Sequence, residues 1–380
     1  MIGSVLIVCI LLVTVELSSY IALRFGILPR LPALFYITPP SMNEARYKEH
    51  MQYQHPVVGW ATVSPDEKRY SVEIESRPNT LFPGEVSACV SLYGDSFTFA
   101  DEVEDHDAWG SVLSGLLECK VANYGQGGYG TDQAYLRFEL NNADQAPINI
   151  LGIYPDNILR NLNQYRPFLA GPYASWLAVK PRFVIDESDE LKLIPQPTYT
   201  YDELVQASTT PEILFKHETF LPNSANGLPR YSFPYSLTIA RFITSKKVRN
   251  FFSKTPTWIH YLDEDHPAKG LEIASRIIGK FGTLSNQRGQ RPLVIIYPTP
   301  SSFDYFRRTG NSATDPISQA ADKQGIEFLD LHEPFSRHLG DRSYCDLLTM
   351  ADSCEGHYNA EGNRVVAGII SGLLKPMIDG

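Results

Sequence analysis

The sequence has few cysteines and fewer basic than acidic residues. Only five of its 380 residues are cysteine, and no Cys-x-x-Cys pair is present to hold zinc. Lysine and arginine total 33, against 43 aspartate and glutamate residues, which gives a formal net charge of −10. A nucleic-acid-binding protein needs a basic face for the phosphates, so this balance argues against that class. Internal repeats and low-complexity tracts are also missing, and the hydrophobic fraction of 43% is ordinary for a globular protein.

One long apolar run stands at the N-terminus. Residues 2–15 are almost unbroken apolar sequence, and the run resumes after Glu16 as far as Leu23. A helix over 2–23 would be roughly 30 Å long, which matches the hydrocarbon core of a bilayer. We therefore expect residues 1–24 to form a single transmembrane anchor, with Glu16 near the outer third of the span. The alternative is a cleaved signal peptide, although the sequence lacks the basic n-region and the Ala-x-Ala site that such a peptide needs.

The pattern of apolar residues and prolines in the sequence changes near residue 88. Residues 25–87 contain eight prolines and no helical periodicity, which predicts an extended, proline-rich tether with short strands. Residues 88–380 alternate between strand-like and helix-like segments, which predicts a parallel sheet with helices on both faces. The predicted strands cover residues 88–93, 120–124, 148–154, 292–297 and 326–331. The predicted helices include residues 109–118, 131–142 and 360–377.

This alternation defines the expected fold. Right-handed crossovers between five parallel strands give an α/β, doubly wound, flavodoxin-like sheet. A long interruption at roughly 160–290 separates the third and fourth strands and is expected to be an insertion. Helices are predicted in it near 235–254 and 266–285.

Polar residues stand where the predicted strands end, and these ends are the usual ligand-binding edge of such a sheet. Ser96 follows Gly94 at the first strand, where a glycine permits a sharp turn that presents the hydroxyl. The common alternative for such a serine is a helix N-cap. Asn157 follows the third strand and could donate its amide to an oxyanion, or simply form a turn. His357 precedes the last helix, as a general base would.

The second predicted strand ends in a glycine-rich turn, Asn123-Tyr-Gly-Gln-Gly-Gly-Tyr-Gly130. It contains Gly-x-Gly-x-x-Gly, the fingerprint of a dinucleotide-binding turn. That fingerprint follows the first strand of a nucleotide-binding domain, whereas here an earlier strand already ends at Gly94. We therefore favour a different use, in which the glycines expose a backbone N–H group as an anion donor.

Together these blocks resemble the SGNH (GDSL-type) hydrolase superfamily. Gly94-Asp-Ser96, the glycine-rich turn, Asn157 and His357 match its order and spacing over residues 88–376. The sequence looks like bacterial members with an N-terminal anchor, a proline-rich tether and a Val-Gly-Trp motif, here Val58-Gly-Trp60. The resemblance implies that Ser96 is the nucleophile and His357 the base. It assigns the oxyanion hole to the backbone N–H groups of Ser96 and Gly128 and to the side chain of Asn157. It implies no cofactor and no metal.

Two positions depart from the family pattern. The third block is usually Gly-x-Asn-Asp, whereas here Asp156 precedes Asn157; we keep Asn157, because a carboxylate would repel an oxyanion. The family also places an aspartate three residues before the histidine, and this chain has Cys354 there. Asp352 is the expected replacement as third member of the triad. A Ser–His dyad with a backbone carbonyl on the imidazole is the alternative.

The cysteines give a further expectation. We hypothesise a Cys345–Cys354 disulfide that closes a short loop before His357, a pairing that suits an oxidising compartment. Cys89 and Cys119 lie in apolar runs and are expected to be core residues.

The resemblance implies ester chemistry through an acyl-enzyme. Water as second acceptor would give an esterase, and a sugar hydroxyl an O-acyltransferase. With an anchor, the expected protein is single-pass, with a periplasmic catalytic domain acting on acylated envelope glycan, small molecule or lipid. The alternative is a catalytically weak or inactive SGNH-fold binding module in polysaccharide assembly, which the missing aspartate would fit. A nucleotide-binding enzyme is a third hypothesis.

Overall fold

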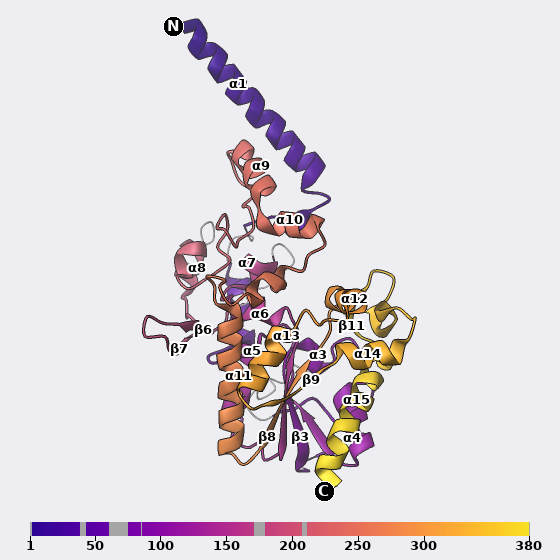
Figure 1. The fold of residues 1–380 in the computed structure, drawn as a ribbon. Coiled ribbons are helices and arrows are strands. Elements are labelled where there is room, and N and C mark those ends of the chain that lie inside the picture. The colour runs from indigo at the N-terminus through magenta and orange to yellow at the C-terminus, as the bar shows by residue number, and fades with distance from the viewer. Residues whose placement is uncertain are drawn as a thin grey trace. The chain divides into compact units, whose positions relative to one another are not determined.

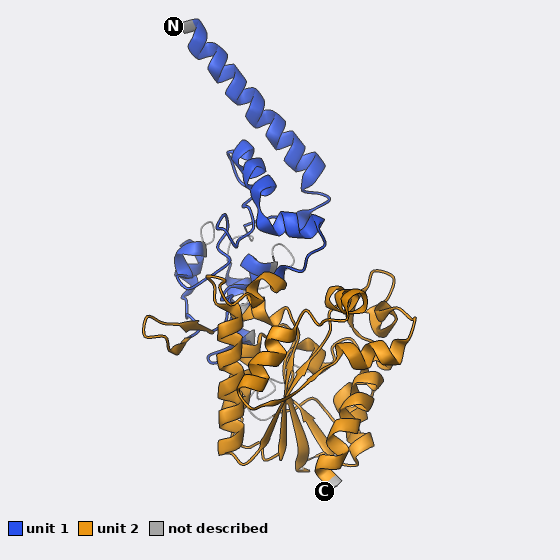
Figure 2. Ribbon diagram, viewed as in Figure 1, with its two compact units in different colours: residues 1–60, 162–181, 195–257 blue, residues 61–161, 182–194, 258–380 orange. Residues whose placement is uncertain are grey.

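A computed structural model describes residues 2–38, 43–60, 75–84, 86–170, 179–206 and 211–379. Two compact units make up the chain (Figure 2). Unit 1 consists of residues 1–60, 162–181 and 195–257, and unit 2 of residues 61–161, 182–194 and 258–380. Much of the predicted tether therefore shares a unit with much of the predicted insertion. Residues 61–74 of the tether lie outside the described residues.

Unit 2 is built on a five-stranded sheet with the order β4-β3-β5-β8-β9. Every neighbouring pair in it is parallel, which confirms the doubly wound α/β fold. All six residues of β5 are buried, as expected for a central strand covered on both faces. The strands are β3 (Ala88–Tyr93), β4 (Lys120–Asn123), β5 (Ile148–Ile153), β8 (Arg291–Ile296) and β9 (Glu327–Asp330).

Helices cover both faces of this sheet. Figure 1 shows α5, α11 and α13 on one side and α4, α14 and α15 on the other. The long helices are α4 (Trp109–Leu117), α5 (Thr131–Leu140), α11 (Gly270–Gln287), α13 (Asp315–Lys323), α14 (His332–Leu339) and α15 (Ala360–Asp379). The predicted helices at 109–118, 131–142, 266–285 and 360–377 are present as α4, α5, α11 and α15, whereas α13 and α14 were not predicted. The shorter elements are α3 (Ser96–Phe99), α6 (Asn157–Asn161), α12 (Pro300–Thr309), η5 (Thr257–Leu262), η6 (Tyr344–Leu347), and the strands β6 (Arg182–Ile185), β7 (Leu191–Ile194), β10 (Leu348–Met350) and β11 (Glu355–Tyr358).

A buried tryptophan connects the core of unit 2 to the carboxyl edge of the sheet. Trp109 begins α4 and is fully buried in the main hydrophobic cluster. Its indole N–H donates to the backbone oxygen of Phe97 at 3.0 Å, and its backbone N–H donates to Asn363 Oδ1 at 3.2 Å. A buried indole needs such a partner. The core therefore fixes the position of the turn that follows β3.

Two disulfides lie in unit 2. The hypothesised Cys345–Cys354 bond is present and closes the loop around the β10–β11 hairpin. Cys89 and Cys119 form the second, a bond that was not predicted. Both half-buried side chains do pack against the core, but β3 and β4 are neighbours in the sheet and bring the two Cα atoms to 6.1 Å. The sequence alone does not show which strands are neighbours.

Unit 1 begins with the apolar helix. The stretch Gly3–Ile27 is long and apolar enough to cross a membrane, a property that a signal sequence shares. A second, smaller hydrophobic cluster around Leu23, Phe35 and Phe242 holds the unit together. Its elements are α1 (Ile2–Ile21), η1 (Ala22–Ile27), η2 (Pro32–Leu34), α2 (Glu44–Tyr53), β1 (Gln54–His55), β2 (Gly59–Trp60), α7 (Arg166–Ala170), α8 (Tyr201–Gln206), η4 (Pro211–Leu214), α9 (Tyr235–Thr244) and α10 (Lys246–Phe252).

Candidate active site

The turn after β3 presents Ser96 as the first residue of α3. The N-cap of this helix is Asp95, whose carboxylate accepts the backbone N–H of Phe97 at 3.0 Å. Capping therefore does not require the hydroxyl of Ser96, a residue that is 4% exposed. Gly94 makes the turn possible, since a Cβ there would lie 2.9 Å from the backbone oxygen of Gly152. Local backbone geometry thus places a serine at the carboxyl edge of the central strands.

The glycine-rich turn after β4 lies against this serine turn. The backbone N–H of Gln126 donates to the backbone oxygen of Gly94 at 3.1 Å. A Cβ at Gly125 would come within 2.3 Å of the backbone nitrogen of Phe99, so only glycine permits this approach to α3. Gly128, the predicted oxyanion donor, has a φ of +77°, in the left-handed region that favours glycine. The two turns therefore pack against each other through backbone atoms.

Asn157 joins the ends of three strands. Its side-chain Nδ2 donates to Asp95 Oδ2 at 2.9 Å and to the backbone oxygen of Tyr129 at 3.1 Å. Its Oδ1 accepts the backbone N–H of Tyr154 at 2.9 Å. Arg160 contacts the same Asp95 oxygen at 3.1 Å, which offsets the charge of that buried carboxylate. Both amide hydrogens of Asn157 are thus occupied within the protein.

His357 lies in β11 next to an acidic residue that the sequence analysis did not select. Its Nδ1 is 3.0 Å from Glu102 Oε1, and its backbone N–H donates to Glu102 Oε2 at 3.1 Å. The hydroxyl of Thr349 also donates to this carboxylate. The ring of Phe97, the neighbour of Ser96, lies 4.9 Å from the imidazole ring. The structure therefore places His357 against Glu102 and in ring contact with Phe97, the residue that follows Ser96.

Asp352, the predicted third member, lies elsewhere. It is exposed in the turn between β10 and β11, and within the part of the chain that the structure describes no hydrogen bond or ion pair joins it to His357. Glu102 has the contacts that were expected of Asp352. The only sequence signal for it was the acidic run Asp101-Glu-Val-Glu-Asp105 shortly after Ser96.

Two carboxyl groups at the site have shifted pKa values. Burial raises the pKa of Asp101, whose Oδ2 lies 3.1 Å from where a Cβ on Gly127 would stand. For Glu102, partial burial acts to raise the pKa. The hydrogen bonds from Thr349 and His357 outweigh it, and the pKa lies below its usual range. Glu102 is therefore the ionised partner of His357 near neutral pH.

Arg77 fixes the loop that carries Glu102. Its buried guanidinium donates to the backbone oxygens of Phe99, Ala100 and Val103 at 2.6–2.7 Å, and to Asp105 Oδ1 at 2.8 Å. Ala100 and Glu102 have φ values of +65° and +71°, which are unfavourable for residues with a side chain. Such a backbone persists only where surrounding contacts enforce it. Arg77, from the range predicted as tether, supplies these contacts.

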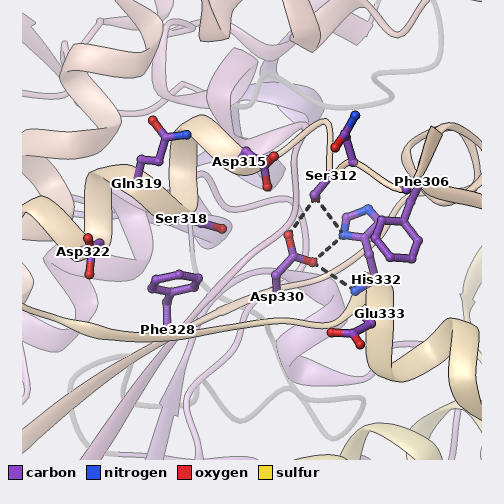
Figure 3. A pocket seen from close by; sticks show the side chains of 12 residues that line it. Phe306, Ser312, Asp315, Ser318, Gln319, Asp322, Phe328, Asp330, His332 and Glu333 are labelled. Atoms are coloured by element: carbon purple, nitrogen blue, oxygen red, sulfur yellow. Dashed lines mark hydrogen bonds and ion pairs between the residues drawn. The ribbon is translucent and has the colours of Figure 1, made fainter.

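A second Ser–His–Asp arrangement stands at the ends of β8 and β9. His332 Nε2 lies 2.7 Å from Ser302 Oγ, and its Nδ1 lies 2.5 Å from Asp330 Oδ1. Figure 3 shows the carboxylate of Asp330 bonded to both Ser312 and His332, and these residues line a pocket of about 500 Å³. Ser302 does not line this pocket, is 1% exposed, and uses its Oγ to accept the backbone N–H of Thr299. This group ties together α12, the loop before α13 and the start of α14.

The described residues contain no group of three or more His, Cys, Asp or Glu side chains that could hold a metal ion. No family model and no curated protein matches the sequence. The fold is similar to solved structures, of which three at 9–14% identity are described next.

One is described as a member of the G-D-S-L lipolytic family from Desulfitobacterium hafniense, 14% identical over 75% of this chain and 98% of that chain, with a TM-score of 0.36. Another is an acetylxylan esterase mutant from Geobacillus stearothermophilus, 10% identical over 80% and 95%, TM-score 0.38. A third is an esterase from Pseudoalteromonas, 9% identical over 77% and 98%, TM-score 0.37. These similarities are too distant to assign an activity.

Proposed function

We propose that this chain is a serine hydrolase of the SGNH type that acts on carboxylic esters. The observation that carries the proposal is that His357 contacts both Glu102 and Phe97, the residue next to Ser96, at the carboxyl edge of the sheet. Ser96 stands at the sharp turn between β3 and α3. The ring of the next residue, Phe97, contacts the imidazole ring of His357. Glu102 contacts Nδ1 of that histidine, so Nε2 is the ring nitrogen that would take the proton of Ser96. This is the order of roles in a nucleophile–base–carboxylate triad.

The reaction follows from these roles. Ser96 Oγ attacks the ester carbonyl carbon while His357 Nε2 takes the hydroxyl proton, and Glu102 stabilises the imidazolium that forms. The tetrahedral oxyanion accepts hydrogen bonds from the backbone N–H groups of Ser96 and Gly128. The imidazolium then protonates the leaving alcohol, and an acyl-Ser96 ester remains. A water or a sugar hydroxyl, deprotonated by His357, attacks this ester and releases the acid or the new ester.

Asn157 has a different part in this proposal from the one expected from the resemblance. For its side chain to donate to the oxyanion, it would have to give up its bond to Asp95 or to Tyr129. We assign it the positioning of the serine turn against the glycine-rich turn, and leave the donation to the backbone. Its burial and three hydrogen bonds favour this role.

The two disulfides and the apolar helix support an extracytoplasmic site of action. Disulfides such as Cys89–Cys119 and Cys345–Cys354 persist in oxidising compartments. With α1 as a membrane anchor, unit 2 would lie in the periplasm of a bacterial envelope. Acylated glycan or lipid of the envelope is then the substrate class that the site would meet, with hydrolysis or acyl transfer as the outcome.

A fluorophosphonate probe tests the nucleophile. Such probes react with activated serines, so the wild-type protein should be labelled and Ser96→Ala should not. The matched control is Ser302→Ala, which removes the buried serine of the second arrangement and should leave labelling in place. Labelling lost in Ser302→Ala but kept in Ser96→Ala would move the active site. A folded wild-type protein that is never labelled would favour the inactive binding module.

A further inference from the structure

Two short helices of unit 1, α9 and α10, and the residues beside them expose large apolar side chains to solvent. Five such residues fall within the stretch 233–252, although the other faces of the helices pack into the cluster around Leu23 and Phe35. Single exposed apolar residues are ordinary, but a concentration of them marks an interaction surface. The five, with their exposed fractions, are Phe233 (70%), Leu237 (43%), Ile243 (65%), Phe251 (52%) and Phe252 (64%).

The first of these helices is bonded to the apolar N-terminal helix. Glu16 accepts the backbone N–H of Tyr235 at 2.7 Å and both the backbone N–H and the hydroxyl of Ser236. These are N–H groups of the first turn of α9, which otherwise lack partners and attract a negative charge. The rings of Tyr20 and Tyr235 also meet at 5.1 Å. Figure 1 shows α9 beside the C-terminal part of α1.

This bond sets the level of α9 along α1. Glu16 lies within the stretch Gly3–Ile27 that is apolar enough to cross a membrane. A carboxylate there is an objection to a lipid-buried helix unless a partner satisfies it. Because α9 is that partner, the start of α9 lies at the level of Glu16, in the C-terminal third of α1 (Ile2–Ile21). The exposed apolar side chains of α9 and α10 then lie beside the C-terminal end of α1.

The charge of the segment fits the same location. Residues 235–254 contain five basic residues and no acidic one, in a chain whose net charge is −10. Lys246, Arg249 and Lys254 among them are exposed. Helices that combine apolar and basic side chains lie in the interface of bilayers that contain anionic lipid.

We propose that α9 and α10 form a lipid-binding surface that lies in the membrane interface beside α1. Phe233, Ile243, Phe251 and Phe252 insert among the acyl chains, and the exposed bases contact anionic headgroups. The occupant is the bilayer itself, continuous with the one that α1 spans. Unit 1 is then held against the membrane along two helices in addition to α1. The proposal rests on α1 as a span but not on the assignment of Ser96.

Photocrosslinking in proteoliposomes tests this with the full-length protein. The photoreactive residue p-benzoylphenylalanine replaces Phe252 in one variant and Val8 of α1 in a second. The matched control is the replacement of Phe328, a phenylalanine of β9 that is 38% exposed. After irradiation, mass spectrometry identifies what is attached to each peptide. We expect phospholipid adducts at positions 252 and 8 and none at 328.

Each of the other outcomes contradicts one part of the proposal. Adducts at position 8 without adducts at 252, or protein adducts at 252, would show that α9 and α10 do not lie in lipid. Failure at position 8 would remove the span and the surface with it, while leaving fluorophosphonate labelling of Ser96 untouched. The adduct at 252 should also increase several-fold when about one third of the phosphatidylcholine is replaced by phosphatidylglycerol. The variant Lys246→Glu/Arg249→Glu should lose this increase, and an increase that persists would contradict the headgroup contacts.

Discussion

Glu102 Oε1 lies 3.0 Å from His357 Nδ1, although the two residues are 255 positions apart in the chain. In the SGNH pattern that the sequence resembles, the carboxylate comes from the histidine's own loop, three residues earlier. Here that place is taken by Cys354, whose disulfide to Cys345 shapes the loop. The carboxylate beside His357 instead comes from the loop that follows Ser96, the proposed nucleophile. One short segment, Ser96 to Glu102, thus supplies both the proposed nucleophile and the partner of the base.

Replacing Glu102 should slow catalysis without unfolding the protein. Glu102→Gln keeps the size of the side chain but removes the charge that stabilises the imidazolium. We expect kcat to fall roughly 10²-fold, less than for a fully buried triad carboxylate, because Glu102 is 40% exposed. Asp352→Asn is the matched control and should change kcat less than about twofold. The reverse ranking of the two variants would restore Asp352 to the triad.

The pH dependence of kcat/KM provides a second test of the Glu102→Gln variant. Because the pKa of Glu102 lies below its usual range, wild-type His357 faces a negative charge throughout the neutral range. Removing the charge makes the protonated imidazole less favourable. The acid limb of kcat/KM should therefore move to lower pH in Glu102→Gln. An unmoved limb would show that Glu102 does not act on the base.

Arg77 should act on catalysis through Glu102. Lysine cannot span the three backbone oxygens and the Asp105 carboxylate that the guanidinium reaches. We expect Arg77→Lys to lower kcat about tenfold or more and to lower the melting temperature, since buried carbonyls lose partners at about 1–3 kcal/mol each. Stability alone does not separate positioning from scaffolding, so the double variant is needed. In the Glu102→Gln background the same change should reduce kcat little further. Full additivity would mean that Arg77 acts elsewhere.

The sheet and the serine turn could be predicted from the sequence because their signals are local. The apolar runs before Gly94 and Asn123, with glycines after them, give the strands to within a residue or two. Glu102 could not be found this way, because its function depends on a loop held by Arg77 and on a histidine from the other end of the domain. The Cys89–Cys119 bond depends in the same way on which strands are neighbours.

In unit 1, too, contacts between segments far apart in the chain could not be predicted from the sequence. The apolar helix and the helical segment near 235–254 were each predictable from composition and spacing. The bond from Glu16 to the start of α9 was not, since 219 residues separate Glu16 from Tyr235. From the sequence alone Glu16 is an acidic residue within an apolar run, whereas the structure gives it a partner.

The buried second arrangement should contribute to stability and not to turnover. Burial acts to raise the pKa of Asp330, but the hydrogen bonds and charge of His332 outweigh it, so the pKa is lowered in the folded protein. A lowered carboxyl pKa stabilises the fold above the unfolded-state value of about 4 and loses that effect as the pH falls below it. The difference in unfolding free energy between wild type and Asp330→Asn should thus be largest at neutral pH and shrink below about pH 4. Ser96 should label equally in both proteins at pH 7; a loss in Asp330→Asn would point to a catalytic role.

The two disulfides should separate stability from catalysis. Cys345–Cys354 spans 9 residues and Cys89–Cys119 spans 30, so loop-closure entropy predicts about 2–3 kcal/mol for the first and about 3–4 kcal/mol for the second. Only the first lies in the hairpin that carries His357. Replacing Cys345 and Cys354 with serine should therefore lower kcat several-fold with a modest loss of melting temperature. The same change at Cys89 and Cys119 should lower the melting temperature more and leave kcat near the wild-type value. Equal effects on kcat from both pairs would mean that the short disulfide does not position the histidine.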